Sequence, residues 1–159
     1  MAGGVEPVPE GLHTVVTRLV FDDAPAAIAF YQDAFGAIVP IEPHKAPDGK
    51  VVHSEIRIGD SVVYLTDEGE DRNGVAPSSV GGVVTAVMAL NVPDVDALWE
   101  RAVAAGCEVV YPLADQFYGD RAGRLRDPFG HQWMLSTHVE DVDRDEMDRR
   151  MQAWSEQQG

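Results

Sequence analysis

The chain has 159 residues, of which 45% are hydrophobic and 25% are charged, the composition of a folded globular protein. Its 12 basic and 27 acidic side chains give a formal net charge of −15 at pH 7, and a field of this sign repels phosphate backbones and anionic lipid head groups. We therefore exclude nucleic acid and membrane surfaces as partners.

The start of the chain and its cysteine content indicate where the protein resides. The stretch MAGGVEPVPEGL has neither the basic nor the apolar region of a secretory signal, and no segment approaches the roughly 20 apolar residues of a membrane span. We therefore expect a cytoplasmic protein. The single cysteine, Cys107, excludes an intramolecular disulfide, and the apolar run CEVVYPL around it predicts a buried, unreactive thiol.

Residues 19–39 and 89–110 share one plan, which predicts an internal repeat. In each, a β-rich run ends in an aspartate, Asp23 or Asp94, and a helix of about eleven residues follows, with apolar side chains at spacings of three and four. A glycine at the expected left-handed end of the helix, Gly36 in the first repeat, then leads into a second β-rich run.

The residues after each helix repeat as well. The stretches VVHSEIRIGDSVVYLTDE and GRLRDPFGHQWMLSTHVED are each typical of a strand, a glycine-centred hairpin and a further strand, which matches Leu65 with Leu135. The predicted order is βαβββ in residues 12–67 and again in 84–138, with the Gly-, Ser- and Asn-rich residues 68–83 as a linker. One such module leaves a sheet face uncovered, so the modules should pack on each other or on a partner chain, and we expect a homodimer.

Residues 142–158 are predicted to form a third helix. Asp143 and Glu146 have the spacing of an N-terminal capping pair, and three large apolar side chains share one side of the helix: Met147, Met151 and Trp154. This stripe would cover the edge of a module or a dimer partner, or else close over a ligand as a lid.

Two βαβββ modules with a DPxG turn before the last strand resemble the vicinal oxygen chelate superfamily, which includes glyoxalase I, bleomycin-resistance proteins, fosfomycin-resistance enzymes and extradiol dioxygenases. Residues 53–68 and 118–142 are most similar to its PhnB-like branch, and the resemblance covers residues 12–142. It implies an α+β fold in which the two modules curl a mixed sheet into half-barrels around a cavity. It does not fix the activity, because the superfamily contains isomerases, lyases, dioxygenases and non-catalytic drug binders.

The resemblance also implies where a metal ion would be bound. The metal enzymes of this superfamily place one ligand on the first and one on the last strand of each module. Matching the aspartate and leucine landmarks puts these positions at Val16, Tyr64, Val87 and Met134. None is a histidine or a glutamate, and aliphatic or thioether groups do not satisfy the divalent ions that these enzymes use. We therefore expect no metal centre and no cofactor, with a cavity wall in its place.

Charged residues of the first module provide a second possible arrangement. His53, Glu55 and Arg57 share one face of the predicted third strand, and Arg18 lies on the same side of the first strand as Val16. His53 and Glu55 could form a displaced metal pair, but two ligands do not make a site and the arginines would repel a cation. The other interpretation is an ion-pair network that lines the cavity.

The last strand of the second module alternates between two faces. Trp133 and Leu135 should pack on a helix, whereas the opposite face directs three side chains into the cavity: Gln132, Met134 and Ser136. With the aromatic residues nearby, this predicts an aromatic and apolar small-molecule site with a few polar anchors.

The loop FYGDRAGR carries a polar cluster formed by Tyr118, Asp120 and Arg121. It is either part of the ligand site or a bulged loop held by an Asp–Arg pair. His138, at the acidic end of the last strand, is a candidate general base or an edge residue.

Together these patterns favour a metal-free protein that sequesters a hydrophobic or aromatic small molecule, as bleomycin-resistance proteins do, with a role in antibiotic resistance. The alternative is a glyoxalase-like enzyme, an isomerase, lyase or dioxygenase, that acts on a small metabolite. The sequence does not identify its catalytic residues, but a metal-free enzyme could use Tyr64, His53 and Glu55 for acid/base chemistry. The predicted ligand-binding residues are Val16, Arg18, His53, Glu55, Tyr64, Val87, Tyr118, Arg121, Gln132, Met134 and Ser136.

Overall fold

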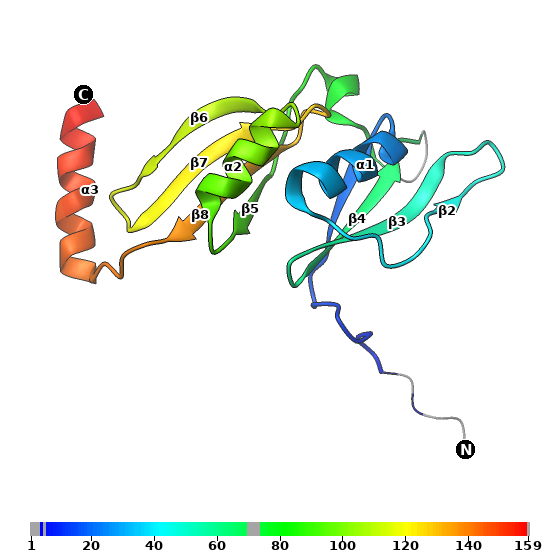
Figure 1. Ribbon diagram of the computed structural model, residues 1–159, viewed down its shortest axis with the longest axis horizontal. Coiled ribbons are helices and arrows are strands. Elements are labelled where there is room, and N and C mark those ends of the chain that lie inside the picture. Colours follow the sequence, from blue (N-terminus) through cyan, green and yellow to red (C-terminus); the bar gives the residue numbers. More distant parts are fainter. Residues whose placement is uncertain (1–3, 5, 70–73, 159) are drawn as a thin grey trace. The chain divides into compact units, whose positions relative to one another are not determined.

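The computed structural model describes residues 4, 6–69 and 74–158, and these form two compact units, Met1–Val83 and Val84–Gly159 (Figure 1). Within the described residues each unit contains one four-stranded mixed sheet with a helix after its first strand. The predicted α+β architecture of two βαβββ modules and a C-terminal helix is confirmed. Residues 70–73 of the predicted linker lie outside the described part of the chain.

The sheet of the first unit has the strand order β1-β4-β3-β2, with β1 parallel to β4 and the other pairs antiparallel. A short 3₁₀ helix, η1 (Pro77–Val80), follows the module. The elements of the module are β1 (Thr17–Phe21), α1 (Ala24–Phe35), β2 (His44–Lys45), β3 (Val51–Ile58) and β4 (Ser61–Asp67).

Helix α1 begins and ends where the sequence predicts. The Asp23 carboxylate accepts a hydrogen bond from the Ala26 N–H (3.0 Å), and Gly36 ends the helix in the left-handed conformation at φ 67°. The helix start is also tied to the sheet, because the buried Asp67 carboxylate accepts hydrogen bonds from the N–H groups of Ala24 (2.6 Å) and Val51 (2.7 Å).

The second strand of the first module is much shorter than expected. The β-rich run after α1 forms only an isolated bridge between Ile38 and Arg57, and β2 is confined to two residues. Pro40 and Pro43 explain the difference, because proline has no N–H to donate to a strand ladder.

The sheet of the second unit has the matching order β5-β8-β7-β6, and α2 lies across one face of it (Figure 1). Its register repeats that of the first sheet, since Leu19 pairs with Leu65 and Leu90 pairs with Leu135. The elements are β5 (Val87–Asn91), α2 (Val95–Ala104), β6 (Glu108–Asp115), β7 (Asp120–Arg126), β8 (Gln132–His138) and α3 (Arg144–Gln158).

The core under α2 explains two features of the sequence. A Cβ atom on Gly123 would lie 2.5 Å from the Trp99 ring, so only glycine allows this helix to pack so closely on β7. The Asp127 carboxylate of the DPFG turn accepts hydrogen bonds from the N–H groups of Phe129 (3.0 Å) and His131 (2.9 Å) and from Trp133 Nε1 (3.0 Å). The turn is therefore fastened to the strand that follows it.

Cys107 is a buried free thiol, as predicted. Burial, with a smaller contribution from the Asp127 charge, raises the pKa of its thiol to about 12, so the reactive thiolate is not formed at neutral pH.

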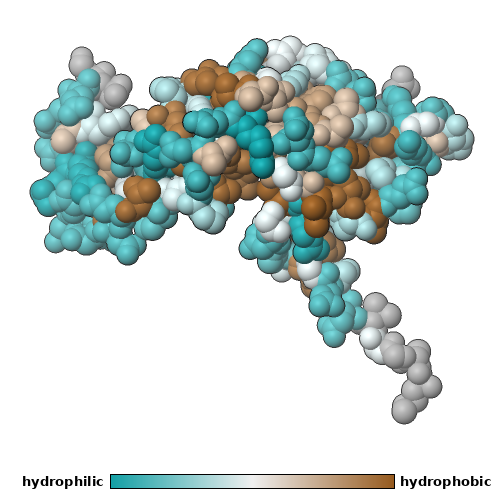
Figure 2. Space-filling model, in the orientation of Figure 1, coloured by the Kyte–Doolittle hydropathy of each residue, from teal (hydrophilic) through white to brown (hydrophobic). Residues whose placement is uncertain are grey.

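Helix α3 stands at one end of the second sheet, and its surface is dominated by hydrophilic residues (Figures 1 and 2). Asp143 caps it by accepting a hydrogen bond from the Glu146 N–H (3.0 Å), as the capping pair predicts. The Trp154 ring lies 5.6 Å from that of Phe117, yet Trp154 remains 48% exposed, so the predicted apolar stripe is covered only in part within this unit. None of the helices in the described ranges is long and apolar enough to cross a membrane.

Candidate functional site

The face of each sheet opposite its helix, called here the open face, holds most of the site residues that the sequence predicts for that unit. On the first sheet Arg18 pairs in register with Tyr64, and Tyr64 pairs with Glu55. The Arg18 guanidinium carbon lies 6.0 Å from the centre of the Tyr64 ring, a weak cation–π contact. Three of the predicted residues therefore form one row across β1, β4 and β3.

His53 joins this row. Its Nε2 lies 3.2 Å from Glu55 Oε1, and its ring meets the Tyr64 ring edge to face at 4.8 Å between centres. His44 of β2 stacks on the other side of His53 at 6.1 Å, a neighbour that sequence reasoning missed because proline residues hide the two-residue strand. The His53 and Glu55 side chains are 28% and 21% exposed, so the pair is within reach of a small molecule.

Two glycines outside the strands lie close to side chains of this sheet. A Cβ atom on Gly11 would lie 2.9 Å from Arg57 Nη2, so the N-terminal segment passes directly over that guanidinium. A Cβ atom on Gly74 would lie 3.4 Å from Val20 of β1. The His53 and Glu55 side chains nevertheless remain partly exposed.

The open face of the second sheet contains a pocket of about 150 Å³. Tyr118 and Met134 line it, and Met134 forms part of its wall, the role that the sequence suggested. The full lining is Tyr111, Gln116, Tyr118, Ala122, Gly123, Arg124 and Met134.

Tyr118 lines this pocket, and its phenol is the kind of group that can donate a hydrogen bond. Burial, and to a lesser degree the nearby Asp120 charge, raises the pKa of the Tyr118 hydroxyl above its ordinary value. The phenol is therefore neutral at pH 7 and keeps its proton.

Sequence reasoning missed five of the lining residues: Tyr111, Gln116, Ala122, Gly123 and Arg124. Of these, Arg124 is the charged one. It pairs in register with Tyr111 on β6 and with Met134 on β8, and its guanidinium carbon lies 5.2 Å from the centre of the Tyr111 ring. The pairing of β6 with β7 is irregular on both sides of Tyr111. The simple alternation of strand side chains therefore does not predict which face of the sheet Tyr111 occupies.

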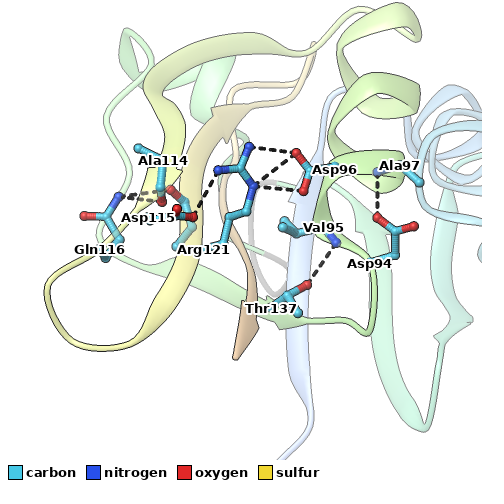
Figure 3. A network of polar contacts seen from close by, with 10 residues as sticks. Asp94, Val95, Asp96, Ala97, Ala114, Asp115, Gln116, Arg121 and Thr137 are labelled. Atoms are coloured by element: carbon cyan, nitrogen blue, oxygen red, sulfur yellow. Dashed lines mark hydrogen bonds and ion pairs between the residues drawn. The ribbon is translucent and has the colours of Figure 1, made fainter. Parts of the chain in front are cut away.

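Arg121 lies on the other face of the same strand, toward α2 (Figure 3). Its Nε and Nη2 donate to the Asp96 carboxylate at 2.8 Å each, and Nη1 donates to Asp115 at 3.1 Å. The hydrogen bonds with Asp96 and then Asp115 raise the pKa of Arg121, and the guanidinium lowers the pKa of Asp96. Arg121 is thus held by two carboxylates outside the FYGDRAGR stretch and is not among the residues that line the pocket, whereas Tyr118 of the same stretch is.

The remaining predicted residues of the second unit lie on β5 and β8. Ser136 is buried and donates its hydroxyl to Asn91 Oδ1 at 2.7 Å, so it is engaged within the sheet. Val87 pairs in register with Gln132 and is 40% exposed. Ser136, Val87 and Gln132 are not among the residues that line the 150 Å³ pocket.

Comparisons with known proteins identify the family of this chain. The family model described as the Glyoxalase/Bleomycin resistance protein/Dioxygenase superfamily matches residues 11–135. The chain belongs to this superfamily. An uncharacterized protein of Mycobacterium bovis is 41% identical over 156 residues, which cover 96% of this chain and 97% of that protein.

Several solved structures share the fold of this chain. TioX from Micromonospora sp. ML1 has a TM-score of 0.64 and 28% identity, covering 80% of this chain and 99% of TioX. The PhnB protein from Bacillus cereus has a TM-score of 0.60 over 79% of this chain and 99% of its own, but at 15% identity its likeness is one of fold alone. The predicted resemblance to the superfamily, with a PhnB-like neighbour, is confirmed.

Membership in the superfamily raises the question of a metal ion. The matched leucine pairs confirm that the two modules share one register, and the assignment of the four ligand positions to Val16, Tyr64, Val87 and Met134 stays a prediction. An aliphatic, phenol or thioether donor set does not fit a divalent ion. Within the described ranges, no three or more His, Cys, Asp or Glu side chains converge as a metal site would require.

Proposed function

We propose that this protein binds an aromatic small molecule reversibly on the open face of its second sheet. The observation that carries the proposal is the pocket itself, where Tyr111, Tyr118 and Met134 surround a space of about 150 Å³. Aromatic rings and a thioether favour planar ligands through stacking, edge-to-face and sulfur–ring contacts.

The size of the pocket limits what it holds. An apolar cavity of about 150 Å³ accepts a molecule the size of benzene, whereas sites for drug-sized ligands measure roughly 300–1,000 Å³. The pocket would therefore hold one aromatic ring, either as a complete ligand or as one end of a larger molecule. Stoichiometric capture of such a molecule is the mode of action of a sequestering protein, and a role in antibiotic resistance would follow if the ligand is a drug.

The test is a ligand screen with variants of one residue. Purified protein is titrated with a panel of one-ring and two-ring aromatic compounds, and binding is measured by thermal shift and calorimetry. Tyr118→Ala should weaken binding about tenfold because a ring contact is lost, whereas the control Tyr118→Phe should bind within about threefold of the natural protein. Equal affinity of all three proteins for every compound would contradict the proposal.

The geometry of the first unit favours a second candidate, acid/base catalysis without a metal ion. The 3.2 Å contact between His53 and Glu55, beside the Tyr64 ring, is the arrangement of a proton-transferring pair with a carboxylate that orients the imidazole. Ligands found in the screen would be tested for turnover, with His53→Ala and Glu55→Ala expected to abolish it. Metal analysis of protein purified without chelators completes the test, since a stoichiometric transition metal would point to a metal-dependent enzyme.

A further inference from the structure

Arg124 differs from the other charged residues of β7. Asp120 lies 2.8 Å from His138, Arg121 is bound by two carboxylates, and Arg126 lies 3.5 Å from Glu108. Arg124 has no carboxylate partner in the part of the chain that the structure describes. In a chain with 27 acidic residues, this guanidinium is left without a counter-charge at the edge of a pocket.

The surroundings of Arg124 leave its charge available. Its guanidinium carbon lies 5.2 Å from the Tyr111 ring centre, and its Nε is buried without a hydrogen-bond partner, a feature shared with Arg126. A guanidinium placed against a ring keeps the N–H groups at its outer edge free, and these form a fork that fits a carboxylate with two parallel hydrogen bonds. The neighbouring acidic residues Asp115 and Asp120 are already paired with Arg121 and His138 and do not compete for it.

The repeat supplies an internal comparison. Because Tyr64 pairs with Glu55 in the first sheet and the equivalent Met134 pairs with Arg124 in the second, Glu55 and Arg124 occupy the same position of the two modules. The first open face therefore presents a carboxylate where the second presents a guanidinium. The first open face also carries Arg18, but that guanidinium lies in one row with the Glu55 carboxylate, whereas Arg124 has no carboxylate partner among the described residues.

We propose that Arg124 anchors an anionic group of the ligand, so that the pocket selects a planar aromatic carboxylate over a neutral ring of the same size. This inference rests on the proposed function, because it names the chemical class of the molecule that the pocket binds. The ring would lie among Tyr111, Tyr118 and Met134, and the carboxylate would reach the free edge of Arg124. The neutral Tyr118 hydroxyl can donate a further hydrogen bond to it.

Benzoate and benzamide test this directly, because the two molecules have nearly the same size and shape and differ by one charge. Each is titrated into the ¹⁵N-labelled full-length chain at pH 7 and constant ionic strength, and the backbone amide signals of Ala122, Gly123 and Arg124 report binding in the pocket. Benzoate should bind at least about tenfold more tightly than benzamide, as a bidentate charged pair predicts.

Three variants attribute this preference to one side chain. Arg124→Gln should reduce it to within about twofold, and Arg124→Lys should retain part of it, because the charge remains but the planar fork is lost. Arg144→Gln is the matched control, since Arg144 is exposed at the start of α3 and should leave the preference unchanged. Dispersed NMR spectra of each variant establish that it is folded.

The possible outcomes separate the two proposals. Equal binding of benzoate and benzamide at the pocket amides would overturn the anchor and leave aromatic binding intact. A preference that survives in Arg124→Gln, or shifts confined to the first unit, would also overturn the anchor. If neither compound moves the pocket amides, both the anchor and aromatic binding at this pocket are wrong.

Discussion

The two units place opposite charges at the same point of the same sheet. Glu55 and Arg124 are equivalent in the repeat, and their neighbours differ as well, with His53 and Tyr64 in the first unit where the second has Ala122 and Met134. On the face that packs against the helix, in contrast, equivalent positions of the two modules carry similar aliphatic side chains: Leu19 and Leu90, Ile56 and Leu125, Leu65 and Leu135. The comparison shows that packing against the helix maintains the module, while the open face is free to carry different chemistry.

The largest expected difference between the two units concerns the side chain that holds the start of each helix to the sheet. Asp67 accepts hydrogen bonds from two buried N–H groups in the first unit, whereas the equivalent Thr137 accepts one from Val95 (2.9 Å) in the second. Asp67→Ala should lower the free energy of unfolding by about 4 kcal/mol, because two buried donors lose a charged acceptor. Thr137→Val should cost about 1 kcal/mol. Urea denaturation of both variants measures the difference, and equal losses would contradict it.

Substitutions at a second pair of equivalent positions, Ser54 and Gly123, should change the free energy of unfolding by a smaller amount. Gly123→Ser places a Cβ atom 2.5 Å from the Trp99 ring and 2.9 Å from the Leu113 backbone, so we expect a loss of about 3 kcal/mol in the free energy of unfolding. Ser54→Ala removes only the hydrogen bond from Oγ to the Leu65 carbonyl (3.0 Å) and should cost about 1 kcal/mol. Thermal unfolding of the two variants provides the test. A tolerated Gly123→Ser would mean that α2 is free to lift away from β7.

The smallest expected effect concerns pH. Hydrogen bonds with Asp120 and then Asp141 raise the pKa of His138 above its ordinary value of 6.5. The stabilisation that this charged imidazole contributes is complete below the unfolded-state value and is lost as the pH rises through the folded-state pKa. An NMR titration should show Asp120→Asn lowering the pKa of His138, with Asp60→Asn on the β3–β4 hairpin as a control that leaves it unchanged. The first unit has a histidine–carboxylate contact at a different position of its sheet, between His53 and Glu55 (3.2 Å).

Much of the fold was predictable because it depends on local signals. The aspartates before both helices, the capping role of Asp143 and the matching of Leu65 with Leu135 were all identified from spacing. The shortened second strand of the first unit was not, although Pro40 and Pro43 were a visible signal.

The candidate site was harder to predict, because it depends on which face of a strand a residue occupies. Alternation from the apolar Leu125 would have placed Arg121 on the helix face, so that signal was present in the sequence. The position of Tyr111 over Arg124 depends on irregular pairing in β6, which no periodic pattern encodes. Arg124 itself looked like one charge among several in DRAGRLRDP, and only its lack of a partner distinguishes it.

The close contact between Gly123 and Trp99 makes tryptophan fluorescence a probe of the pocket. This residue lines the pocket, and on its other side the Trp99 ring lies so close that even one carbon atom would not fit between them. Only the backbone of Gly123 would therefore separate a ligand in the pocket from the Trp99 indole. Replacing the other two tryptophans, Trp133 and Trp154, by phenylalanine would leave an emission spectrum that registers occupancy without any attached dye.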